Sequence, residues 1–195
     1  MNSKLHRTVL SLLLFGSFGF AQSSAAPSTT PSQPGSAQAT PAVEAKPEDV
    51  RSVDSILAAT YDVISGAAGK KRDWDRFRSL FHSGARLIPA GRRAGESEVN
   101  ARVFTPEEYI QRSRPFLEKD GFFERGVSNK IDRYANIAQV FSTYESRHNA
   151  DDAEPFQRGI NSFQLVFDGK RWWVLTILWQ GETPETPIPA EYLRR

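Results

Sequence analysis

The feature that most constrains the fold is a stretch near the C-terminal end that reads as a β-hairpin with two apolar faces. It runs RGINSFQLVFDGKRWWVLTILWQGE over residues 158–182, and an Asp-Gly pair at 168–169 separates two runs rich in β-branched and aromatic residues. Successive strand residues point to opposite sides of a sheet, and a turn of even length keeps both faces in register. A sheet with helices on one side usually has a polar free side. Here both sides must be covered.

Strict alternation assigns the side chains of the hairpin to two faces. One face carries Asn161, Phe163, Leu165, Phe167, Trp172, Val174, Thr176 and Leu178. The other carries Ser162, Gln164, Val166, Trp173, Leu175, Ile177 and Trp179. Because a large exposed apolar patch marks a contact surface, the second face predicts an interface made by Trp173, Leu175, Ile177 and Trp179. We expect a homodimer formed sheet to sheet; the alternative is that the proline-rich C-terminal segment covers this face.

The first 21 residues have the pattern of a secretory signal peptide, with cleavage expected after Ala21. Lys4 and Arg7 precede an apolar run over 9–20. This run is shorter than the roughly 20 residues that span a bilayer, so a cleaved signal is favoured over a membrane anchor. The chain has no cysteine, which excludes disulfides and a lipid-modified cysteine at the cleavage site. The sequence therefore predicts a periplasmic or secreted protein.

Residues 22–47 are rich in Ser, Ala, Pro, Thr and Gln and predict a disordered linker, so the folded domain is expected over 48–195. Without the two basic residues of the signal, the chain has 23 basic and 23 acidic side chains. A formally neutral chain gives no electrostatic basis for binding nucleic acid or an anionic membrane. We expect neither partner, and no stable membrane span after cleavage.

Within the domain the pattern predicts helices first and a long sheet last. An amphipathic helix is expected over 50–67, and a short one after Asp73, which is a suitable N-cap. Two short strands over 85–91 and 98–104 come next. A third helix begins at a capping box formed by Thr105 and Glu108 and ends before Gly121, and Pro115 is expected to kink it or end it early. Four strands occupy 122–180. This order predicts the α+β class, with a curved antiparallel sheet wrapped around helices that pack on its concave face.

The segments DWDRFRSLF, IAQVFSTYESR and RGINSFQLVFDGKRWWVLTILWQ, with the ending PIPAEYL, resemble the nuclear transport factor 2-like superfamily. The resemblance covers about residues 48–180, and the chain looks like secreted bacterial members of unassigned function. These cystatin-like, cone-shaped α+β domains include ketosteroid isomerase, scytalone dehydratase and SnoaL-type cyclases. The resemblance implies that one sheet face and the helices enclose a pocket, and that the other face often packs on a second subunit. It does not specify an activity, because this fold carries many functions.

The resemblance implies an inward direction for Trp172 and Val174, and hence a set of pocket residues. The predicted lining is Asn161, Phe163, Thr176, Leu178, Tyr61, Trp74 and Phe116. Asn161 is the polar residue that we favour most, because a buried amide must find hydrogen-bond partners.

Three titratable side chains are candidates for catalysis. His82 is also placed to interact with a helix C-terminus, and Tyr144 is also suited to a core or interface position. Asp132 is the carboxylate that an isomerase-like base would require, although no motif supports the match. Arg147 shares its strand face with Glu145, which favours a salt bridge over a ligand contact.

The sequence shows no metal-ligand spacing, no phosphate loop and no dinucleotide-binding fingerprint, so no cofactor or metal is expected. The predicted function is an exported domain that binds a small, mostly apolar molecule in a cone-shaped pocket. One alternative is a cofactor-independent isomerase, dehydratase or cyclase, and another is a protein-interaction module that uses the outer sheet face. Whether the protein is an enzyme stays open at this stage.

Overall fold

The computed structural model describes residues 43–92 and 98–193. The helices are α1 (Pro47–Val50), α2 (Val53–Ile64), α3 (Trp74–Leu80), α4 (Pro106–Asp120) and the short 3-10 helix η1 (Ala190–Tyr192). The strands are β1 (Phe81–Arg92), β2 (Val99–Ala101), β3 (Phe123–Tyr134), β4 (Ile137–Arg147), β5 (Gln157–Phe167) and β6 (Trp172–Gly181). The predicted signal peptide over 1–21 and most of the predicted linker lie outside the described residues. Ala45 is already buried in the core, so packing begins slightly before the expected start of the domain at Glu48.

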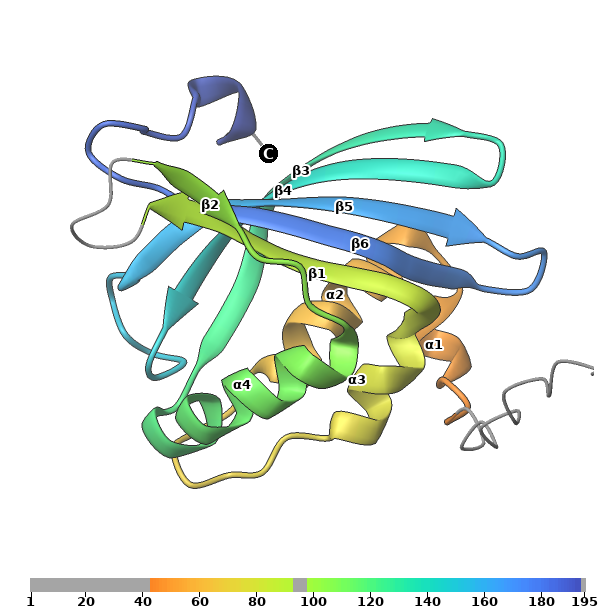
Figure 1. The fold of residues 1–195 in the computed structure, drawn as a ribbon, viewed down its shortest axis with the longest axis horizontal. Helices are drawn as coiled ribbons and strands as arrows, with labels where there is room; N and C mark the ends of the chain where they lie inside the picture. The colour runs from red at the N-terminus through yellow and green to blue at the C-terminus, as the bar shows by residue number, and fades with distance from the viewer. Residues whose placement is uncertain (1–42, 93–97, 194–195) are drawn as a thin grey trace, which may run out of the picture. The chain divides into compact units, whose positions relative to one another are not determined.

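The six strands form one curved sheet in the order β2-β1-β6-β5-β4-β3. β1 runs parallel to β6, and the other neighbouring strands are antiparallel. Helices α1–α4 lie against one face of this sheet, which we call the inner face (Figure 1). The predicted α+β class and the curved sheet wrapped around helices are confirmed.

Local signals in the sequence set the starts of the helices. The Asp73 side chain accepts a hydrogen bond from the Arg76 amide at 2.9 Å and caps α3, as predicted. Thr105 and Glu108 form the predicted capping box at the start of α4. Helix α4 continues past Pro115 to Asp120, so the expected early end is wrong. Gly121 ends the helix with a positive φ of 74°, a conformation that glycine adopts without a steric penalty.

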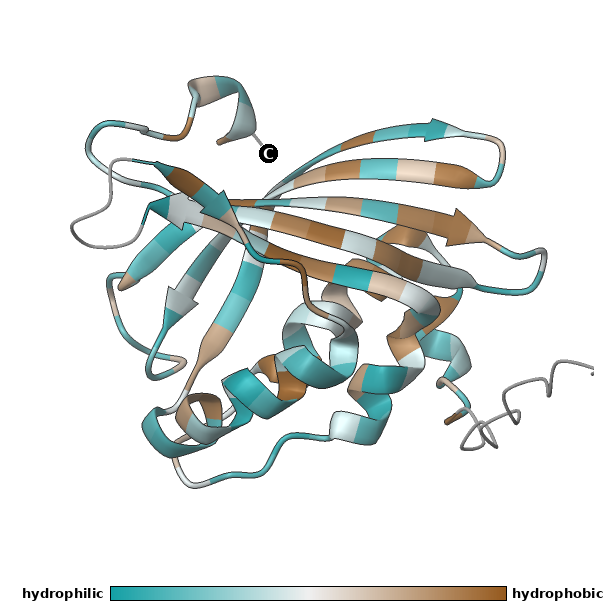
Figure 2. Ribbon diagram, viewed as in Figure 1, coloured by the Kyte–Doolittle hydropathy of each residue, from teal (hydrophilic) through white to brown (hydrophobic). Residues whose placement is uncertain are grey.

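The core lies between the helices and the inner face. Hydrophobic residues occur in both layers, on the helices and on the strands (Figure 2). Ile56 and Phe77 from the helices, and Val140, Phe163 and Val174 from the sheet, are almost completely buried. Burial of large apolar side chains is the main favourable contribution to folding, at about 1.5–3 kcal/mol for each.

The hairpin formed by β5 and β6 contains a bulge that changes the predicted faces. Leu165 pairs with Val174, but the next pair is Gln164 with Thr176, so Leu175 has no partner on β5. Beyond the bulge the alternation is shifted by one residue. Ile177 is therefore buried at 5% exposure, whereas Leu178 is 42% exposed.

The predicted faces hold for Trp172, Trp173 and Val174, which precede the bulge, and are wrong beyond it. Thr176 and Leu178, which were predicted to line the pocket, lie on the outer face. Ile177 and Trp179, which were predicted to form an outer interface, point to the inner side. The predicted apolar stripe on the outer face thereby loses two of its four members.

The C-terminal segment crosses the outer face at β3 and β4 (Figure 1). The Tyr192 ring stacks on Phe141 with centroids 5.5 Å apart, and the Tyr192 carbonyl accepts a hydrogen bond from Thr143 at 2.6 Å. Lys130 on β3 forms an ion pair with Glu191 at 3.5 Å. The C-terminal segment, the alternative to a dimer as the cover of the outer face, thus covers that face at β3 and β4. Homodimerisation through the outer face stays a prediction.

Candidate functional site

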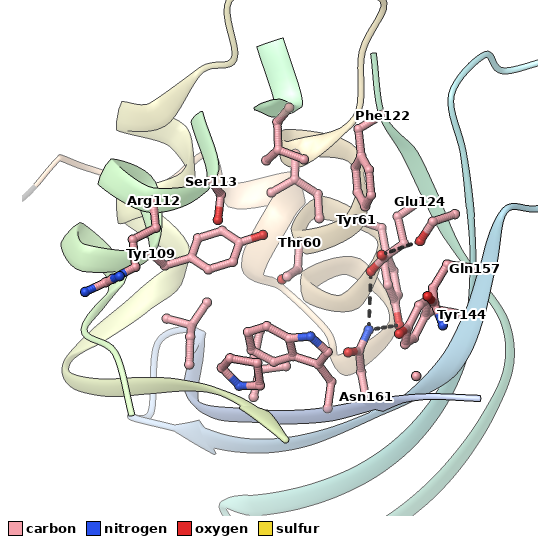
Figure 3. A pocket seen from close by; sticks show the side chains of 18 of the residues that line it. Thr60, Tyr61, Tyr109, Arg112, Ser113, Phe122, Glu124, Tyr144, Gln157 and Asn161 are labelled. Carbon is pink, nitrogen blue, oxygen red and sulfur yellow. Dashed lines mark hydrogen bonds between the residues drawn. The ribbon is translucent and has the colours of Figure 1, made fainter. Parts of the chain in front are cut away.

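A cavity of about 510 Å³ lies between the inner face of the sheet and helices α2 and α4. Its apolar wall includes Ile64, Phe77, Leu117, Phe163 and Ile177. One cluster of polar groups lies at one end, where Tyr61, Glu124, Tyr144 and Asn161 face one another (Figure 3). A space of this size, with apolar walls and a few convergent polar groups, has the dimensions of a small-molecule site.

Four of the seven predicted lining residues do line this cavity, namely Tyr61, Phe116, Asn161 and Phe163. Trp74 does not, because its ring packs edge-on against Phe77 at 5.7 Å and its indole N–H donates to Glu118 at 2.9 Å. Thr176 and Leu178 are excluded by the bulge at Leu175.

Glu124, the acidic side chain at the polar end of the cavity, was not among the residues predicted from the sequence. Glu124 lies near the start of β3, opposite Ser146 on β4. Its Oε2 accepts a hydrogen bond from Ser146 at 2.8 Å, and its Oε1 accepts a longer one from Asn161 at 3.4 Å. Burial raises the pKa of Glu124 to about 7, and these two hydrogen bonds only partly offset the effect. Near neutral pH the carboxyl group is therefore present in both protonation states.

Asn161 is held at the centre of a directed chain of hydrogen bonds. Ser142 donates to Asn129 at 2.6 Å, so Ser142 must accept from the Tyr61 hydroxyl, which is 2.6 Å away. The Tyr61 oxygen in turn accepts from the Asn161 amide at 3.1 Å. Both amide protons of Asn161 are committed to Tyr61 and Glu124. The Asn161 oxygen points away from these partners (Figure 3).

Tyr144 supplies a hydroxyl group without such a commitment. It is a buried residue of β4 that lines the cavity, and within the described ranges no protein group is hydrogen-bonded to its hydroxyl. Burial, together with the negative charge of Glu124, raises the pKa of Tyr144. It therefore remains a neutral O–H donor at physiological pH. The ring passes over Gly159, where an added Cβ would stand 2.5 Å from the Tyr144 hydroxyl oxygen.

The other two catalytic candidates do not face the cavity. His82 is exposed, its Nδ1 accepts a hydrogen bond from the Gly84 amide at 3.1 Å, and its ring meets the edge of Trp173. Asp132 is exposed on β3 opposite Gln139. The expectation that these two side chains contribute to the pocket is wrong. Arg147 forms the expected salt bridge with Glu145, at 3.0 Å.

Over residues 43–92 and 98–193, no three His, Cys, Asp or Glu side chains are grouped so that they could hold a metal ion. No helix in the same ranges is long and apolar enough to cross a membrane.

Comparison with known proteins establishes the fold. No family model matches the sequence, and no curated protein matches it. A Nostoc punctiforme protein of unknown function with a cystatin-like fold aligns with a TM-score of 0.50 and 14% identity, covering 68% of this chain and 90% of its own. A nuclear transport factor 2-like protein of unknown function from Shewanella baltica aligns with a TM-score of 0.42 and 17% identity, covering 67% and 90%.

A protein from Parabacteroides distasonis, named only as a proposed ketosteroid isomerase, aligns with a TM-score of 0.45 and 11% identity, covering 74% and 98%. At these identities the likeness shows the fold alone. The predicted cystatin-like α+β fold is confirmed at that level.

Proposed function

We propose that this protein binds a small, mostly apolar molecule in the cavity between the sheet and helices α2 and α4. The observation that carries the proposal is the combination of an apolar wall with the cluster of polar groups around Asn161 and Glu124. Apolar wall residues such as Phe163 and Ile177 favour a ligand with an apolar body. The polar end favours a ligand with one hydroxyl or carbonyl group.

The polar end offers two hydrogen-bonding atoms that its own network leaves available. The Tyr144 hydroxyl can donate, and the Asn161 oxygen can accept, because the amide protons of Asn161 are committed to Tyr61 and Glu124. A ligand hydroxyl that reaches both atoms would accept from the Tyr144 hydroxyl and donate to the Asn161 oxygen, whereas a ligand carbonyl would accept from Tyr144 alone. These contacts give the site a preference for one orientation.

Binding is tested with phenylnaphthylamine, an uncharged apolar dye whose fluorescence rises on leaving water. The matched variant is Ser113→Phe, since Ser113 is a small residue of α4 whose side chain points into the cavity (Figure 3). The wild-type protein should show saturable binding with one site per chain, and Ser113→Phe should abolish it without loss of secondary structure. Equal binding by both proteins would place the dye elsewhere and contradict the proposal.

A second candidate function is acid–base catalysis without a cofactor. The observation that favours it is Glu124, whose pKa of about 7 suits a group that both takes and returns a proton near neutral pH. In this case Glu124 would remove a proton from carbon next to a ligand carbonyl, and the Tyr144 hydroxyl would stabilise the charge that develops on oxygen.

The catalytic proposal is tested by proton–deuterium exchange into a panel of small ketones, followed by NMR. Exchange should increase as the pH rises through about 7, because the carboxylate is the active form. It should disappear in Glu124→Gln and decrease in Tyr144→Phe. Exchange no faster than in buffer would leave binding as the function.

Export is part of the proposal, and the pattern of residues 1–21 supports it. N-terminal sequencing of the protein isolated from its own host should begin at Gln22. A chain that retains Met1 would contradict export by a cleaved signal.

A further inference from the structure

Two arginine side chains stand at the rim of the cavity, away from its acidic end. Arg102 follows β2, and Arg112 lies on α4; both line the cavity. In Figure 3, Arg112 is on the side of the cavity opposite Glu124. The guanidinium group of Arg112 and the carboxyl group of Glu124 therefore lie on opposite sides of the cavity.

Both guanidinium groups lie over the ring of Phe104. Its ring centroid is 5.7 Å from the guanidinium carbon of Arg102 and 4.8 Å from that of Arg112. The Phe104 backbone pairs with Leu87 of β1 through two hydrogen bonds, at 2.8 and 2.9 Å, which fixes the ring to the sheet. Stacking on an aromatic ring restrains a guanidinium group and leaves its N–H groups available.

Neither arginine is neutralised by an ion pair with another described residue. By contrast, Arg76 pairs with Asp49 at 2.7 Å. The acidic side chain nearest in sequence to Arg112 is Glu108, one helical turn earlier. Its Oε2 accepts both hydrogen bonds from Thr105, at 2.8 and 3.0 Å, in the capping box of α4. These bonds are the main cause of the lowered pKa of Glu108, and the positive charge of Arg112 adds to it without a direct ion pair.

We propose that the ligand is an amphipathic anion, whose oxyanion group is bound by Arg102 and Arg112 at the rim and whose apolar body fills the cavity. This inference rests on the proposed binding function and specifies the ligand class. A planar guanidinium group matches a carboxylate or sulfonate through paired N–H···O bonds. A head group at the rim also stays partly in water, so its charge need not be fully desolvated.

The test compares two dyes that differ by one charged group. The two dyes share one aromatic skeleton. Anilinonaphthalene sulfonate carries a negatively charged sulfonate group on it, whereas phenylnaphthylamine is uncharged. The double variant Arg102→Gln/Arg112→Gln keeps polar side chains at the rim and removes both charges. The control is Arg114→Gln, which removes one exposed positive charge from the same helix, at a position that does not line the cavity.

The double variant should weaken binding of the sulfonate about tenfold and leave binding of the neutral dye unchanged, as expected for two partly solvated ion pairs. Arg114→Gln should change neither. Unchanged sulfonate affinity in the double variant, or an equal loss in Arg114→Gln, would overturn the inference while the proposed function stands. Failure of the neutral dye to bind the wild-type cavity would overturn both.

Discussion

Replacing Glu124 by glutamine should remove a pH-dependent loss of stability from this protein. The pKa of Glu124 is about 7 in the folded protein, against an ordinary value of 4.5 that we take for the unfolded chain. Between these two values the folded state keeps a proton that the unfolded state has released. The free energy of unfolding therefore falls as the pH rises through this interval. Below about pH 4.5 the contribution is fully present, and above about pH 7 it is lost.

The size of the effect follows from the rise in pKa. A change from 4.5 to about 7 corresponds to about 3 kcal/mol of stability lost on going from acid to alkaline pH. Most of this loss falls above about pH 5. Glutamine cannot ionise, and it matches the protonated carboxyl group when its carbonyl oxygen accepts from Asn161 and its amide donates to Ser146, whose hydroxyl can also accept. The variant should thus be close to wild type in mild acid and more stable by about 3 kcal/mol at about pH 8.

The assay is urea unfolding of both proteins at several pH values, followed by tryptophan fluorescence. The control is Glu145→Gln. Burial raises the pKa of Glu145, but hydrogen bonds to Arg147 and Arg125 outweigh this and lower it, so the group is ionised in both states across the same range. The difference between this control and wild type should be independent of pH. Parallel stability curves for wild type and Glu124→Gln would refute the raised pKa and the argument from burial.

Three further predictions test the geometry. In thermal unfolding, Gly159→Ala should destabilise the protein by about 2 kcal/mol or more, because a Cβ would overlap the Gln180 carbonyl and the Tyr144 hydroxyl. The control Gly84→Ala should leave the stability unchanged, because its Cβ would meet only His82, at 3.5 Å. Ile177→Asp should cost about 4 kcal/mol or prevent folding, while Leu178→Asp on the outer face should cost under about 1 kcal/mol; the reverse order in chemical denaturation would rule out the bulge at Leu175. Light scattering at micromolar concentration should show a homodimer, and a monomer would end the interface prediction.

The helices and the order of the strands were predictable because their signals are local. Asp73, Thr105 and Glu108 act on backbone groups within three residues of themselves, so the sequence near each helix start contains the whole interaction. The turn at Asp168 and Gly169 is equally local. Pro115 shows the limit of such signals, because the packing of α4 maintains the helix beyond it.

The faces beyond the bulge were not predictable from alternation alone. A bulge costs one pairing interaction, and it is favoured here because it buries Ile177 and Trp179 in place of Thr176 and Leu178. A signal was present, since strict alternation placed the polar Thr176 among inward apolar residues. The polar Thr176 indicates that the alternation is interrupted, but it does not tell at which residue of the strand the bulge occurs.

The environment of Glu124 was not predictable because its partners are distant in the sequence. Next to Arg125, it reads as one half of a surface ion pair. Its burial depends on Tyr61, Ser146 and Asn161, which come from three other elements. Gly126, two residues further on the same face, is the one nearby residue that reflects this packing. A Cβ at Gly126 would stand 3.0 Å from the Tyr61 ring, so the close approach of Tyr61 favours glycine there.

The most direct test of a ligand site built around a titrating carboxyl group is a carbon-13 NMR titration of the glutamate side chains, with and without phenylnaphthylamine. Glu124→Gln identifies the resonance of Glu124. We predict that this resonance titrates with a midpoint at about pH 7. Bound dye should shift the midpoint to higher pH, because the dye removes water from the carboxyl group. A Glu124 resonance that titrates near 4.5, or that is indifferent to a bound dye, would contradict the site proposed for this cavity.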